Sequence, residues 1–222
     1  SDLLKKGILV ELAGPETLHE EILYANSKIV NHSDLLRYHT GPNDTTVSVK
    51  VFSPDPLSTA RVSYGGNYVD SNDQNYPLIE SQQKVDSIVA TYSNGSFRAL
   101  NDYVKISDFS APVIAPITSL TPEMQYTRDQ AGFEDMNVLY HITKHKKHLI
   151  NLGYPNLPSY RIEIDPHALN GADQSFFTTS ANPPRLYFGE GGVDDAEDAD
   201  VIIHEYTHAI IHSASPSTTT ST

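Results

Sequence analysis

The stretch DVIIHEYTHA, residues 200–209, decides how this chain is interpreted. It contains the pattern H-E-x-x-H, formed by His204, Glu205 and His208. Apolar residues on both sides of the pattern predict a helix over about residues 195–213, buried on nearly every side. Side chains four residues apart lie on one face of a helix, so both imidazoles can reach one Zn²⁺, with Glu205 beside the water to be activated. The motif therefore predicts metal-assisted hydrolysis, most often of peptide bonds.

A chance match is the alternative explanation for so short a motif. A buried helix that carries two histidines and a glutamate must satisfy these polar groups, however, and a bound metal ion does so. We therefore interpret His204 and His208 as zinc ligands and Glu205 as the general base of a hydrolase.

The third zinc ligand is harder to find, because a catalytic zinc ion takes three protein ligands and one water. The metzincin extension is excluded, since it needs Gly and His where this chain has Ile211 and Ala214. His212 lies eight residues after His204, about 12 Å along a helix, which is too far for ligands of one tetrahedral ion. No Asp or Glu follows Glu205. We therefore predict that the third ligand lies beyond these 222 residues. We expect His212 to be a surface group or to contact a zinc ligand without touching the ion.

The composition restricts the classes of protein that fit. A net charge of −13 on 222 residues is poorly suited to binding nucleic acid or an anionic membrane. No run approaches the roughly 18 apolar residues of a membrane span, and residues 1–5 are not a signal peptide. The absence of cysteine excludes disulfides and thiolate metal sites. If the protein is exported, its signal peptide was removed or lies outside this sequence. We expect a monomer that acts on peptide or protein substrates in the extracellular space.

The sequence pattern divides the chain into three regions, residues 1–40, 41–118 and 119–222. In the first region, residues 7–12 predict a strand, and residues 21–24 predict either a strand or a short helix. No internal repeat links the three regions.

The second region is β-rich. Val47, Val49 and Val51 alternate with polar residues, which is typical of a half-buried strand. The dipeptide Asn94-Gly95 predicts a hairpin turn between two strands.

The third region alternates between helix and strand. Residues 133–152 predict a helix that Gly153 can end. Its apolar stripe is formed by Val138, Ile142, Leu149 and Leu152. Strands are predicted around residues 160–164 and 186–188, followed by the motif helix. The predicted fold class is α+β, with a β-rich N-terminal part followed by an α/β part that ends in the motif helix.

The motif and its surroundings resemble a known family. Residues 200–209 look like the active-site helix of gluzincins, and the form H-E-Y-T-H is typical of fungalysins. The preceding run FGEGGVDDAEDAD, residues 188–200, is similar to that of fungalysin-like and thermolysin-like proteases exported by Bacteroidetes-type bacteria. The resemblance covers about residues 130–216. It implies that residues 119–222 form the N-terminal lobe of a thermolysin-like zincin, with the active-site helix at the end of the chain.

The same resemblance implies that the chain stops before the C-terminal helical lobe. In the family, that lobe supplies a Glu as third zinc ligand and a Tyr and a His that stabilise the transition state. Residues 22–26 resemble the end of a fungalysin-type propeptide, so residues 1–40 are interpreted either as a propeptide remnant or as leading strands.

The segment Asp173–Phe177 is placed like the family's Asn-Ala-aromatic edge strand, thirty residues before His204. In thermolysin-like enzymes this strand pairs with the substrate backbone. The resemblance thus implies substrate binding by Gln174 and Ser175, although the family usually has Asn and Ala there. The alternative is an aromatic-rich core strand.

An acidic run precedes the motif helix. Six acids fall in it without a basic residue: Glu190, Asp194, Asp195, Glu197, Asp198 and Asp200. Acids at a helix N-terminus complement the helix dipole and cap backbone amides, which is the interpretation we favour. The alternative is a Ca²⁺ site, since oxygen ligands cluster here.

The favoured function is that of a zinc-dependent endopeptidase, of which this chain is the N-terminal lobe. One alternative is a catalytically inert, protease-like module that binds zinc or a surface. An aminopeptidase-type gluzincin ranks lower, because the sequence contains no exopeptidase recognition stretch upstream of the motif. We expect these 222 residues alone to show little or no peptidase activity, because the third zinc ligand is missing.

Overall fold

The chain separates into two compact units, Ser1–His39 and Thr40–Thr222. The computed structural model describes five stretches of the chain: residues 8–10, 20–25, 28–34, 43–70 and 73–215. The β-rich region and the α/β region of the sequence therefore belong to one unit.

The first unit contains one antiparallel sheet in the order β1-β2-β3. Its strands are β1 (Ile8–Val10), β2 (Glu20–Ala25) and β3 (Lys28–Asp34). The strand predicted over residues 7–12 is confirmed for residues 8–10, and its other positions lie outside the described residues. The segment 21–24 is part of a strand and not of a helix.

A five-stranded sheet in the order β8-β6-β5-β4-β9 forms one part of the second unit. Its strands are β4 (Asp44–Val51), β5 (Lys84–Ser93), β6 (Ser96–Arg98), β8 (Thr118–Ser119) and β9 (Glu123–Met124). The predicted alternation is confirmed, because Val47, Val49 and Val51 are buried. The hairpin is confirmed as well, since Asn94 and Gly95 between β5 and β6 both have positive φ, as the favoured two-residue turn requires.

A four-stranded sheet in the order β11-β12-β10-β7 forms the other part. Its strands are β7 (Val104–Ile106), β10 (Ile162–Ala168), β11 (Ser175–Thr178) and β12 (Arg185–Gly189). β10 runs parallel to both β7 and β12, whereas β11 is antiparallel to β12 and lies at the edge. An edge strand keeps one row of backbone N–H and C=O groups free of sheet pairing.

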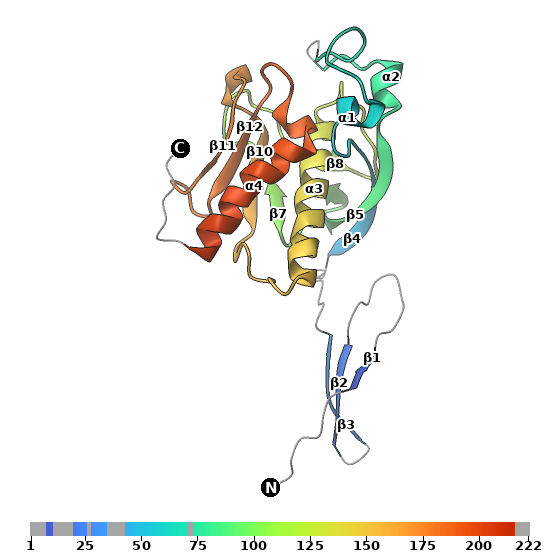
Figure 1. Cartoon of the computed structure of the whole chain (residues 1–222), viewed down its shortest axis with the longest axis vertical. Helices are drawn as coiled ribbons and strands as arrows, with labels where there is room; N and C mark the ends of the chain where they lie inside the picture. The colour runs from blue at the N-terminus through green and yellow to red at the C-terminus, as the bar shows by residue number, and fades with distance from the viewer. Residues whose placement is uncertain (1–7, 11–19, 26–27, 35–42, 71–72, 216–222) are drawn as a thin grey trace. The chain divides into compact units, whose positions relative to one another are not determined.

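Two long helices lie side by side against these sheets (Figure 1). The helices and 3-10 turns are α1 (Pro56–Ala60), α2 (Pro77–Glu80), α3 (Gly132–Asn151), η1 (Leu169–Gly171), η2 (Asp195–Glu197) and α4 (Ala199–Ala214). One core joins both sheets to α3 and α4 through residues such as Val49, Leu139, Ile164 and Ile202. Along the described chain, no helix has the length and apolar character needed to cross a membrane.

The helix predicted over residues 133–152 is confirmed as α3, but its apolar stripe is shorter than expected. Val138 and Ile142 are buried, whereas Leu152 is 57% exposed because the helix has ended and this residue forms its C-cap. The mixed sheets and helices confirm the predicted α+β class.

The motif helix differs from the prediction in two respects. It begins at Ala199 and not at residue 195, because the side chain of Asp198 caps it by accepting a hydrogen bond of 2.7 Å from a backbone N–H of the first turn. It is also only half buried. Ile202 and Tyr206 lie in the core, but Ile211 on the other face is 45% exposed. The expectation of burial on nearly every side is therefore wrong.

Candidate metal centre

The three motif side chains that could bind a metal lie together on α4. Potential ligand atoms of His204, Glu205 and His208 all lie within 4.8 Å of one another. The two imidazole rings are 5.1 Å apart between centroids and are inclined at 79°. His204 is exposed and His208 is half-buried, so both rings remain accessible from solvent. The residues predicted from the spacing therefore form a group that can hold a metal ion.

Glu205 is the buried member of this group, with 7% of its surface exposed. Burial raises the pKa of its carboxyl above the ordinary value, while His208, His204 and a hydrogen bond from the backbone of Phe177 act in the opposite direction. Because Phe177 belongs to β11, this last contact connects the motif to the edge strand. The carboxylate thus lies beside both histidines and β11.

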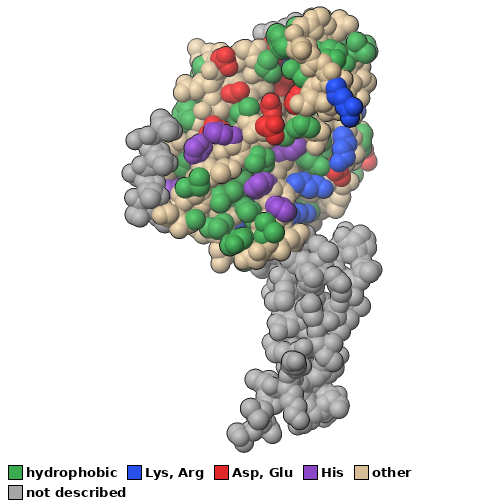
Figure 2. All heavy atoms as spheres, viewed as in Figure 1, with side chains coloured by type: hydrophobic (Ala, Val, Ile, Leu, Met, Phe, Trp, Pro, Cys, Tyr) green, Lys and Arg blue, Asp and Glu red, His purple; other side chains and the backbone are tan. Residues whose placement is uncertain are grey.

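The opposite face of α4 anchors the motif. Ile202, Tyr206 and Ala209 are buried in the core, at the three- to four-residue spacing of a helical stripe. The ring of Tyr206 also meets that of His145 on α3 edge to face, with 5.9 Å between centroids. Burying a large apolar side chain stabilises a fold by about 1.5–3 kcal/mol. Histidine side chains gather among hydrophobic ones on the face that carries α3 and α4 (Figure 2).

His212 lies outside the ligand group, in agreement with the distance argument from the sequence. Its Nδ1 is 3.3 Å from the hydroxyl oxygen of Tyr160, and its ring lies 5.7 Å from that of Phe177. His212 therefore packs against β11 and the segment before β10, two helical turns beyond His204.

The residues predicted to bind substrate lie at the start of the edge strand. Gln174 is exposed and directly precedes β11, and its carbonyl accepts a hydrogen bond of 3.1 Å from the backbone N–H of Gly189. Ser175 is the first residue of β11 and donates its hydroxyl hydrogen bond to Asp195. The expected edge strand is thus present near the motif, while the side chain of Ser175 is already bound within the protein.

The acidic run before α4 divides between two roles. Asp198 and Asp200 lie at the helix N-terminus, as the favoured interpretation predicted. Asp194 and Glu197 are instead buried, each with 2% of its surface exposed. Glu197 accepts two hydrogen bonds from the guanidinium of Arg128, at 2.9 and 2.7 Å. Burial raises the pKa of Glu197 to about 7 even beside that cation.

A second potential metal-binding group includes Asp194 and two residues that the sequence did not single out. Asp70 and Asp73 lie in the loop between α1 and α2, and together with Asp194 they offer carboxylate oxygens within 4.8 Å of one another. We call these three residues the acidic triad. No local spacing connects Asp73 to Asp194, so only their proximity in the folded chain identifies the group.

Neither the protein-family models nor the curated proteins include a match to this chain. The chemistry of α4 and β11 is therefore the basis for assigning a function.

Proposed function

We propose that this protein is part of a zinc-dependent endopeptidase whose catalytic group is His204, Glu205 and His208. The observation that carries the proposal is their close grouping on the accessible side of α4, next to the edge strand β11. The resemblance of residues 188–209 to fungalysin-like gluzincins supports the same reaction, with residues 119–222 as the N-terminal lobe of a thermolysin-like fold.

The donor set suits zinc. Two neutral imidazoles are common Zn²⁺ ligands, and they approach the ion from one helix face when they are four residues apart. A bound zinc ion would make a water molecule more acidic and polarise the carbonyl of a peptide bond. His204 and His208 would orient the ion from one side, and the side away from the core remains accessible. We propose a third ligand from outside the described residues.

Glu205 would act as the general base. Its carboxylate lies within 4.8 Å of potential ligand atoms on both histidines, which is the position needed to accept a proton from the attacking water. The same carboxyl would then deliver that proton to the leaving amine. A side chain with 7% exposure is also held in one orientation by its surroundings, which favours a defined proton path.

The edge strand β11 would bind the substrate in an extended conformation. Its partner β12 pairs with it along one side only, so a peptide can add to the other side by backbone hydrogen bonds. The contact between the Phe177 backbone and Glu205 brings this strand next to the proposed base. Exposed Gln174 would contribute an amide for a carbonyl of the peptide.

The proposal is tested by measuring casein cleavage by the protein produced in full length, with and without a zinc chelator. We expect chelation to abolish cleavage and added zinc to restore it. Glu205→Gln should lower kcat by about 10²- to 10⁴-fold, because it removes the general base and keeps the side-chain shape. Glu123→Gln, an exposed residue on β9, is the matched control and should leave activity unchanged.

Two outcomes contradict the proposal. Full activity of Glu205→Gln would exclude this carboxyl as the base. Zinc binding without any peptide cleavage by the full-length protein would favour the inert, protease-like module instead.

A further inference from the structure

The acidic triad brings three carboxylates to one point from separate parts of the chain. Asp70 and Asp73 belong to the loop between α1 and α2, and Asp194 directly precedes η2. One oxygen from each residue lies within 4.8 Å of the others. Carboxylates at this distance repel one another unless a cation or a proton lies between them.

A second, independent observation shows that one buried oxygen of the triad is unpaired. Asp194 is 98% buried, and its Oδ1 accepts no hydrogen bond within the described structure. Buried carboxylate oxygens are almost always paired, because leaving one unpaired forfeits its hydration without replacement. The side chain of Asp194 shares a hydrogen bond with that of Asp73, and burial raises the pKa of both carboxyls, so only Oδ1 of Asp194 is left over. The unpaired oxygen is therefore suited to a bound cation.

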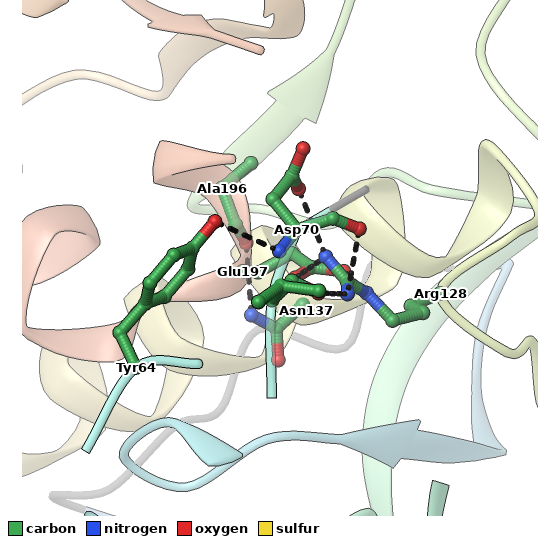
Figure 3. Close-up of polar contacts among 7 residues, drawn as sticks. Tyr64, Asp70, Arg128, Asn137, Ala196 and Glu197 are labelled. Carbon is green, nitrogen blue, oxygen red and sulfur yellow. Dashed lines mark hydrogen bonds and ion pairs between the residues drawn. The ribbon is translucent and has the colours of Figure 1, made fainter. Parts of the chain in front are cut away.

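The neighbouring positive groups are already engaged. Arg128 donates to both oxygens of Glu197 and, at 3.0 Å, to Asp70 (Figure 3). His167 lies with its Nδ1 at 2.9 Å from Glu190. Asp70 and Arg128 also belong to the wall of a small cavity beside α1. The triad, Glu197, Glu190 and Asp135 thus place six carboxyl groups around the two cations Arg128 and His167. This excess of acidic groups favours a divalent ion.

We propose that Asp70, Asp73 and Asp194 bind one Ca²⁺ ion. The ion would connect the loop between α1 and α2 to the segment that leads into α4. Ca²⁺ takes six to eight oxygen ligands in a flexible geometry, whereas Mg²⁺ demands a near-ideal octahedron and usually keeps several waters. Three carboxylates that come from two separate segments of the chain therefore suit calcium better than magnesium. This site is separate from the motif and does not depend on the proposed peptidase activity.

The experiment measures Ca²⁺ binding by isothermal titration calorimetry and thermal unfolding, in the 222-residue chain freed of metal by a chelator. The wild-type chain should bind one Ca²⁺ at the triad. Its Tm should rise by roughly 5 to 10 °C when free Ca²⁺ reaches 100 times the Kd. The double variant His204→Ala/His208→Ala should show the same response, because the motif is not involved.

Asp194→Asn should lose the calcium-dependent rise in Tm, and Asp73→Asn should weaken Ca²⁺ binding at least tenfold. In chelator, Asp194→Asn should be as stable as the wild type or more so, because the neutral amide no longer repels Asp73. The control Glu123→Gln, which replaces an exposed carboxylate far from the triad in the sequence, should keep the full response.

An equal response of the wild type and Asp194→Asn to Ca²⁺ would overturn the proposal, as would the absence of any response in the wild type. A proton shared by Asp73 and Asp194 would then explain the grouping. An equal rise in Tm with Mg²⁺ would overturn the assignment to calcium. If Asp194→Asn does not fold, the titration of Asp73→Asn against the wild type decides the question.

Discussion

The motif group on α4 and the acidic triad both place three potential ligands within 4.8 Å, but they do so in opposite environments. His204 and His208 are nitrogen donors on an accessible helix face, and they can remain there without a metal. Asp194 is a buried oxygen donor that repels its neighbours. A metal ion at the motif would therefore take part in catalysis, whereas a cation at the triad would stabilise the fold.

The largest expected effect is on the ion pair beside the triad. Arg128→Met should lower the free energy of unfolding by about 3 to 5 kcal/mol, because it leaves the buried Glu197 without its cation. Urea denaturation at pH 7.5 measures the change, with Arg161→Met as the control at an exposed position. A loss as small as that of the control would mean that this network contributes little to the fold.

Changes to the motif, in contrast, should affect metal binding strongly and the stability of the fold very little. His204→Ala or His208→Ala should weaken Zn²⁺ binding by more than about 100-fold. Loss of a residue that only hydrogen-bonds to a metal ligand already costs about 10- to 100-fold in affinity, and loss of the ligand itself should cost more. Unfolding free energy should change by no more than about 0.5 kcal/mol for the exposed His204. Calorimetric titration with zinc tests this, and His212→Ala should bind zinc as the wild type does. Weaker binding by the His212 variant would show that the ligand set is misassigned.

A third prediction concerns the charge of His167, which contacts the acidic groups around the triad. Both ring nitrogens of His167 face acceptors, Nδ1 toward Glu190 at 2.9 Å and Nε2 toward the carbonyl of Ala131 at 3.0 Å, so both must donate. Burial alone would lower the pKa of His167, but hydrogen bonds to Asp135 and Glu190 raise it to about 11. His167 is therefore a buried cation near the acidic triad.

A folded-state pKa above the ordinary 6.5 means that His167 stabilises the fold fully below pH 6.5 and less as the pH rises toward 11. Relative to His167→Gln, the wild type should lose about 1.4 kcal/mol of unfolding free energy between pH 8 and pH 9. Urea denaturation from pH 6 to pH 10 measures the difference, and the exposed His148→Gln is the control. Parallel curves for the wild type and His167→Gln would disprove a charged His167.

The smallest expected effect concerns the edge strand β11, which we propose to bind the substrate. Gln174→Ala should raise KM for a peptide by about fivefold, the equivalent of one hydrogen bond of about 1 kcal/mol, with kcat nearly unchanged. Steady-state kinetics on a chromogenic peptide measure both constants. Gln125→Ala removes another exposed amide and should leave KM unchanged. An unchanged KM for the Gln174 variant would exclude its side chain from substrate binding.

Much of the fold follows from local patterns. The alternation of Val47, Val49 and Val51 identified β4, and Asn94-Gly95 identified the turn between β5 and β6. These predictions succeeded because period-two burial and positive φ are properties of a few adjacent residues. The predicted length of the motif helix and its burial on nearly every side were wrong, because Asp198 caps the helix late and one of its apolar faces lies at the surface.

The sequence by itself determined the motif group, because the spacing of His204, Glu205 and His208 on one helix brings their side chains together without help from the rest of the chain. Only the tertiary structure decided that Glu205 is buried beside the edge strand β11. Only the tertiary structure, too, brought Asp73 next to Asp194. The physical reason is that neighbours along a helix are set by its period, whereas neighbours across loops are set by how the whole core packs.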